Sequence, residues 1–228
     1  MPAKYQMFVR EKVIQQDMYY KNTLIMRYTI KYPKFVSETY EVFANKLNSL
    51  YRTKAVMYER SNVMNLYQMA IVDYEYSVAN NYPVHMFEAY VDFTVTYNQN
   101  CALSLYFDQY EYTGGAHGLT IRYSDTWDLS HSRRMELGDF FPHNDHYKDF
   151  IINTINSQIE QQILEEKALY FDDYKTLTLQ NFKANSFYIT KEGLVIFYQQ
   201  YDIAPYAAGI PTFVIPYGPG NAMMPRCD

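Results

Sequence analysis

The chain has 228 residues, of which 48% are hydrophobic, 18% aromatic and 20% charged, and its formal net charge is −5. This composition excludes an intrinsically disordered chain, and the length suits one large domain or two small interlocked ones. The acidic balance argues against a nucleic-acid-binding or other phosphate-binding protein, because such proteins usually carry a basic stripe.

Two long β-strands are predicted at the start of the chain, over residues 5–16 and 22–32, with a turn at 17–22. The second alternates apolar and polar residues with the period of a half-buried strand, and Pro33 is expected to end it. No glycine or proline follows until Pro83, and the apolar residues between them have helical spacing. We therefore expect one long helix or two consecutive ones, with residues 60–62 as a break.

Three strands then follow at short connections, beginning at Phe87, Cys101 and Leu119, and they predict an antiparallel meander. A helix is expected over about 145–167, a hairpin over 187–199 and a last strand over 212–215. The predicted class is α+β, with antiparallel sheets packed against one or two long helices in two interlocked subdomains. We divide the chain into an N-terminal module (1–118), a C-terminal module (119–217) and a tail (218–228).

Glycine and charge are distributed unevenly along the chain. All eight glycines lie after residue 113, and the whole net charge of −5 falls on residues 114–228. Glycine provides the backbone angles that tight loops need, and binding surfaces are usually built on loops. The functional surface is therefore expected in the second half.

Two stretches, Tyr112–Gly118 and Phe187–Gly209, resemble a bacterial family. Its members form the extracytoplasmic, lysozyme-sensing part of anti-sigma-V factors, and the same paired module precedes the catalytic domain of some peptidoglycan deacetylases. The resemblance covers residues 20–217 and implies a non-catalytic module outside the membrane. Its partner would be a lysozyme-like protein or a cell-wall glycan, without nucleic acid and without a cofactor.

The sequence departs from that family in three respects: we expect no membrane helix, no sigma-binding segment and no deacetylase domain. No run of 18 apolar residues could span a membrane. Residues 1–16 also lack the apolar segment of an export signal, so a cytoplasmic location stays open. At most a binding surface carries over from the family, and the oligomeric state is not indicated.

The ligand-binding candidates are the residues of the glycine-rich loop and aromatic side chains near the expected docking loops. They are Tyr112, Gly114, Gly115, His117, Trp127 and Tyr206. Tyrosine and tryptophan offer a large contact area with a polar end, which suits a sugar ring or a protein partner. Each could equally be structural: His117 could fix the loop by hydrogen bonds, and tyrosines could cover the wetter face of a sheet.

Catalytic and metal-binding patterns are weak, and we assign neither kind of site. A hydrolase using His117 with a carboxylate such as Asp202 is the alternative from another class, and a self-associating accessory domain is a third. A metal could use His143, His146 and Asp149, but this spacing falls across a helix start, where capping residues are expected.

The two cysteines, Cys101 and Cys227, have neither zinc-site nor thioredoxin spacing. They could form a disulfide in an oxidising compartment, or both could be free.

Overall fold

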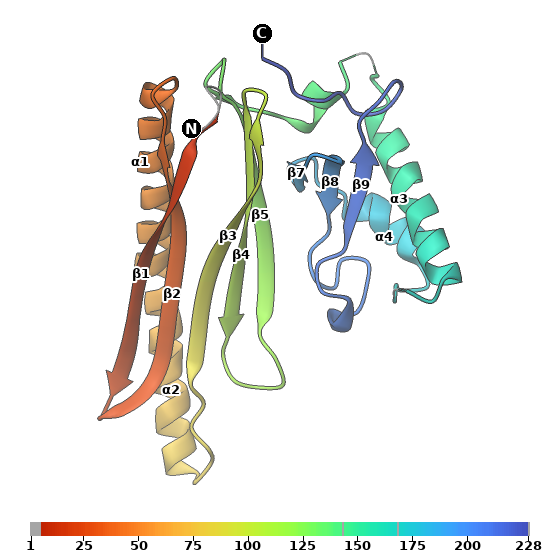
Figure 1. Cartoon of the computed structure of the whole chain (residues 1–228). Helices are drawn as coiled ribbons and strands as arrows, with labels where there is room; N and C mark the ends of the chain where they lie inside the picture. Colours follow the sequence, from red (N-terminus) through yellow and green to blue (C-terminus); the bar gives the residue numbers. More distant parts are fainter. Residues whose placement is uncertain (1–5, 143, 168, 228) are drawn as a thin grey trace.

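Two β-sheets organise the chain, and a long helical segment lies along one face of the larger sheet (Figure 1). The computed structural model describes residues 6–142, 144–167 and 169–227. The larger sheet has the order β1-β2-β3-β4-β5-β6 and the smaller β7-β8-β9. Their bounds are β1 (Phe8–Tyr20), β2 (Thr23–Val36), β3 (Phe87–Gln99), β4 (Ala102–Tyr112), β5 (Leu119–Asp128), β6 (Arg133–Arg134), β7 (Phe187–Ile189), β8 (Gly193–Phe197) and β9 (Thr212–Pro216). The predicted α+β class is confirmed.

The β1–β2 hairpin turns through two residues, Lys21 and Asn22. Their φ angles are 47° and 64°, and positive φ at both central residues is what a two-residue type I′ turn requires. The predicted turn at 17–22 is therefore too long, because β1 continues to Tyr20.

Pro33 does not end the second strand, so that prediction is wrong. β2 continues to Val36, and Pro33 lies opposite Glu11 of β1. β2 pairs with β3 only over Met26–Ile30. Beyond residue 30, no β3 carbonyl faces this edge of β2, so the missing N–H of Pro33 costs no hydrogen bond there. A proline is tolerated at such a position.

The predicted helical region is confirmed as α1 (Glu41–Tyr58), the π-helical turn η1 (Glu59–Val63) and α2 (Met64–Ala79). η1 falls at the predicted break. Buried side chains of α1, among them Phe43, Leu47 and Tyr51, pack into the core between helix and sheet. The helical segment joins β2 to β3, and these two strands run parallel. Parallel strands need a long crossover connection, which the helical segment provides.

β3, β4 and β5 form the predicted antiparallel meander. β5 pairs with β4 along its length, from Leu119 opposite Glu111 to Asp128 opposite Ala102. The division expected after residue 118 therefore separates two paired strands, and the large sheet itself extends to Arg134 of β6.

The rest of the chain forms a second module with its own core. It contains η2 (Leu137–Phe140), α3 (Tyr147–Leu164), α4 (Tyr174–Gln180), the sheet β7-β8-β9 and η3 (Tyr206–Ala208). Ile151, Ile155 and Ile159 of α3 are buried in this core, as the spacing predicts. The predicted hairpin over 187–199 and the last strand are also confirmed.

A disulfide joins Cys101 to Cys227, and the Cα atoms of the pair lie 5.1 Å apart. Of the two alternatives for the cysteines, the structure therefore has the bonded one. The tail is packed as well: Ala222 is fully buried, and the Met223 N–H donates to the Phe140 carbonyl at 2.8 Å. The bond attaches the end of the chain to the β3–β4 turn. Within the described residues, no helix is both long and apolar enough to cross a membrane.

Candidate functional site

The loop between β4 and β5 is the glycine-rich segment that the sequence singles out. Gly114 and Gly115 have φ angles of 86° and 97°, which side chains rarely adopt. At Gly118 a Cβ atom would overlap the Tyr110 ring and the Glu111 carbonyl. The Tyr112 hydroxyl donates to the Gly115 carbonyl at 3.1 Å. These residues give the loop its shape.

His117 projects from this loop and meets two tyrosines of the second module. Its ring stacks on Tyr206 with centroids 3.7 Å apart and an interplanar angle of 15°. Tyr201 lies beside both, with its hydroxyl 3.4 Å from His117 Nε2 and its ring centroid 5.9 Å from that of Tyr206. We call His117, Tyr201 and Tyr206 the junction cluster. The loops 113–118 and 203–210 are thus in contact.

The hydrogen bonds of His117 define its chemistry. Nδ1 lies 3.1 Å from the Gly118 carbonyl, an acceptor, so we assign the proton to Nδ1. Nε2 is then left to accept from the Tyr201 hydroxyl. Neither nitrogen has a carboxylate partner among the described residues, and Asp202 Oδ2 instead accepts from the Gln199 backbone N–H at 2.8 Å. The acid–base pair of the hydrolase alternative is not assembled in this structure.

Tyr201 is held out from the surface by an unusual backbone. Its φ is 67°, in the left-handed region that bulky residues avoid, and 49% of the residue is exposed. The neighbouring Ile203 and Ala204 are buried, and the Asn181 side-chain amide donates to the Asp202 carbonyl at 2.6 Å. A turn anchored by buried neighbours therefore presents this tyrosine to solvent.

Gln199 and Gln200, which precede Tyr201, join the two modules. The Gln199 side chain bonds both backbone groups of Arg122 on β5: Arg122 N–H donates to Oε1 at 2.9 Å, and Nε2 donates to the Arg122 carbonyl at 2.6 Å. Gln200 Oε1 accepts from Thr120 N–H at 2.7 Å. These amides satisfy the edge of β5 as a further strand would.

Serine side chains extend this junction toward β7. Ser124 Oγ donates to the Phe187 carbonyl, and Ser104 Oγ accepts from the Ile189 N–H at 3.1 Å. The Tyr198 hydroxyl is buried within the second module and donates to the Thr178 carbonyl at 2.9 Å. Burial raises the pKa of Tyr198, which keeps this hydroxyl a donor. Most of the stretch Phe187–Gly209 therefore builds architecture, and Tyr201 is its one exposed aromatic residue.

Trp127 is not part of the junction cluster. It packs edge-on against Phe43 of α1, and its indole N–H donates to the Tyr51 hydroxyl at 2.8 Å. Tyr51 in turn donates to Asp125 at 3.1 Å, and burial holds the pKa of Tyr51 well above its usual value. Trp127 thus belongs to the core between α1 and the sheet.

Asp125 is a buried acid that sequence reasoning missed. The residue is 3% exposed, and Lys54 Nζ and Arg134 each lie 2.9 Å from its carboxylate. Asp125 alternates with Tyr123 and Trp127 in the sequence, and an acid in line with these aromatic residues was the available signal. The network ties α1, β5 and β6 together.

Of the three residues considered for a metal, the structure describes His146 and Asp149. His143 lies outside the described residues, and His146 Nδ1 is 3.9 Å from Asp149 Oδ2 with both side chains largely exposed. In the part of the chain that the structure describes, no three His, Cys, Asp or Glu side chains are placed to hold a metal ion.

Two solved structures from bacteria have the same overall fold. A DUF3298 family member from Bacteroides fragilis matches with a TM-score of 0.71 and 21% identity, over 92% of this chain and 90% of that one. A DUF3298 family protein from Pseudomonas aeruginosa matches with a TM-score of 0.59 and 17% identity, over 92% and 91% of the respective chains. At these identities the likeness shows the fold alone. No curated protein is significantly similar in sequence.

Two family models match successive parts of the chain. Residues 20–120 match the model described as deacetylase PdaC, and residues 138–218 match a protein of unknown function, DUF3298. The first spans β2 to the β4–β5 loop, and the second spans most of the C-terminal module. The chain therefore contains, in succession, a segment similar to PdaC and a segment similar to DUF3298.

Proposed function

We propose that this chain is a non-catalytic recognition module of the cell envelope. It would dock a basic protein such as lysozyme against the junction cluster, with a peptidoglycan fragment as the alternative ligand. The observation that carries the proposal is the cluster itself: His117, Tyr201 and Tyr206 come from both modules and form one partly exposed aromatic group.

The chemistry of the junction cluster suits binding. Tyrosine is enriched in binding hot spots because it offers much contact area and a polar hydroxyl at a small entropy cost. The Tyr201 ring already contacts Tyr206 and His117, and a side chain that is placed before a partner arrives has a smaller ordering cost on association. The two nitrogens of His117 contact a carbonyl and a hydroxyl. These contacts hold the imidazole in the ring stack and do not form an acid–base pair with a carboxylate.

Charge favours a basic protein over a neutral glycan. The net charge of −5 falls on residues 114–228, which include the loops of the junction cluster. Opposite charge raises the association rate of a basic partner and makes binding sensitive to salt.

The disulfide supports a location outside the cytoplasm. Structural disulfides persist in oxidising compartments and are rare where thiol reductants are abundant. The Cys101–Cys227 bond is thus consistent with an extracytoplasmic module.

Titration calorimetry tests the proposal, with lysozyme in one arm and soluble peptidoglycan fragments in the other. Tyr201→Ala should weaken binding of the preferred ligand by about thirtyfold, the effect of losing a hot-spot side chain worth about 2 kcal/mol. Tyr19→Ala is the matched control, since Tyr19 is 57% exposed and lies on β1, the opposite edge of the large sheet. The control should bind as the wild type does.

Absence of heat with both ligands at high micromolar concentration would refute the proposed function. Unchanged binding by Tyr201→Ala would refute the junction cluster as its site.

A further inference from the structure

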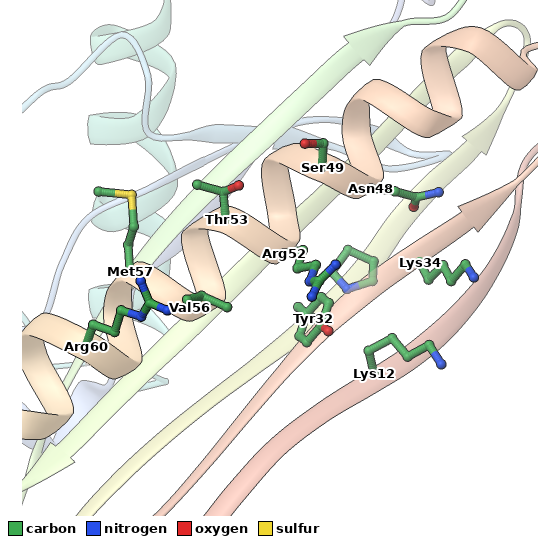
Figure 2. Close-up of a pocket in the computed structure, with 11 residues that line it drawn as sticks. Lys12, Tyr32, Lys34, Asn48, Ser49, Arg52, Thr53, Val56, Met57 and Arg60 are labelled. Carbon is green, nitrogen blue, oxygen red and sulfur yellow. The ribbon is translucent and has the colours of Figure 1, made fainter.

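A groove of about 800 Å³ lies between α1 and the β1–β2 hairpin. Four of its lining residues are cations: Lys12 and Lys34 on the strands, and Arg52 and Arg60 on the helical segment. Figure 2 shows the two pairs on opposite walls of the groove. The lining contains no carboxylate.

These four cations lack ion-pair partners in the described part of the chain. The acidic residues next to them in sequence are engaged elsewhere: Glu11 pairs with Lys31 at 3.6 Å, and Glu59 accepts from the Tyr28 hydroxyl at 2.7 Å. Lys31 points from the other face of β2 and is paired also with Asp92 at 3.5 Å. Positive charge in the groove is therefore not neutralised by the protein, and a cleft lined by one sign of charge attracts counter-ions.

The spacing of the donors indicates an extended ligand. Arg52 and Arg60 are eight residues apart, which is about 12 Å along a helix. Ser49 and Thr53 add two hydroxyl donors on the same wall. A ligand with anionic groups at such intervals can place a separate group at each arginine.

The number of donors favours phosphate over carboxylate. A phosphate ester presents three strong acceptor oxygens and a carboxylate two, so phosphate groups match six donor side chains more fully. Guanidinium groups bind phosphate through two parallel hydrogen bonds. Tyr32 is the one aromatic ring in the lining and is half-buried, so the groove offers no series of platforms for stacked bases.

We propose that this groove binds an extended ligand that carries two or more phosphate groups. The overall net charge of −5 does not oppose this, because residues 1–113 have no net charge and the four unpaired cations gather at one place. The site lies on the N-terminal module and does not depend on the function proposed for the junction cluster.

Calorimetry with the full chain tests the proposal, using tripolyphosphate as the probe, with orthophosphate and a hexaglutamate peptide for comparison. The double variant Arg52→Gln/Arg60→Gln should weaken tripolyphosphate binding by at least about tenfold, because it removes two charged donors. Lys148→Gln/Lys191→Gln is the matched control, since it removes the same charge from the second module and should leave affinity within about twofold. Wild-type affinity should fall as salt rises.

Three results would each overturn the proposal. They are no binding of tripolyphosphate at millimolar concentration, equal affinity of the groove variant and the control variant, and tighter binding of hexaglutamate or orthophosphate than of tripolyphosphate. Circular dichroism of the groove variant excludes unfolding as the cause of a lost affinity, since both arginines are exposed on the helical segment.

Discussion

Replacing Gln199 by alanine should loosen the junction between the two modules. The side chain receives a hydrogen bond from Arg122 N–H at 2.9 Å and donates one to the Arg122 carbonyl at 2.6 Å. Alanine removes both bonds at once and leaves two backbone groups at the edge of β5 without their partner. The perturbation is thus confined to one contact between the modules.

The size of the effect follows from the two bonds. A hydrogen bond contributes about 0.5–1.5 kcal/mol net to stability. A buried donor or acceptor that is left without a hydrogen bond lowers stability by about 1–3 kcal/mol. Because Arg122 is only half-buried, water can replace part of each bond, and we expect a loss of about 2 kcal/mol in the free energy of unfolding. For a chain of this length, that corresponds to a fall in Tm of about 4–8 °C.

Urea denaturation followed by circular dichroism measures this loss, and two variants calibrate it. Gln200→Ala removes a single bond to Thr120 and should cost about half as much. Gln158→Ala removes a single exposed bond to the Val214 carbonyl within the second module and should cost less than about 0.5 kcal/mol. If Gln199→Ala is no less stable than Gln158→Ala, the view that amide side chains hold the edge of β5 is refuted.

Three further predictions concern the remaining supports of the fold. Cys101→Ser/Cys227→Ser should lower the free energy of unfolding by about 2–5 kcal/mol in urea, because the bond closes a loop of 126 residues in sequence, and wild type in reductant should match the variant. Asp125→Asn should cost about 2–3 kcal/mol in the same assay, because it leaves Lys54 and Arg134 without a carboxylate, and a change below 0.5 kcal/mol would contradict the role of this network. Burial and Glu59 raise the pKa of Tyr28 to about 12, so the protonated hydroxyl stabilises the fold below pH 10 and that contribution is lost between pH 10 and 12. In Tyr28→Phe, the fall of stability over that interval should be smaller, as measured by urea midpoints at each pH.

The sequence predicts elements well where a simple period is present. The alternation in β2 and the spacing of α1 and α3 identify their buried faces, because burial selects apolar residues at those intervals. The error at Pro33 arises because its tolerance depends on how far β3 extends, which no local pattern records.

Turns in the N-terminal half are built without glycine. Lys21, Asn22, Asn81 and Asn100 adopt positive φ in its place. Asparagine tolerates this region better than most residues, since its short side chain can bond locally. The lack of glycine therefore reflects turns built from other residues.

The candidate site was predictable only in part. The glycine-rich loop and the stretch Phe187–Gly209 stand out in the sequence, but the stacking of His117 on Tyr206 depends on how the modules dock. Trp127 was misleading, because its strand face points to α1 and the core. The four groove cations lie far apart in the sequence, between residues 12 and 60, and the net charge of the N-terminal half is zero because acidic residues balance them. Only the fold brings these cations together.

The bond between Cys101 and Cys227 makes a covalent ring of everything between them. The ring contains β4, β5 and the whole second module, so one cut by a protease anywhere inside it opens the ring without releasing a fragment. A nicked molecule would run as one species on a non-reducing gel and as two pieces after reduction. A module exposed to hydrolytic enzymes could thus survive a single cleavage with its two halves still held together.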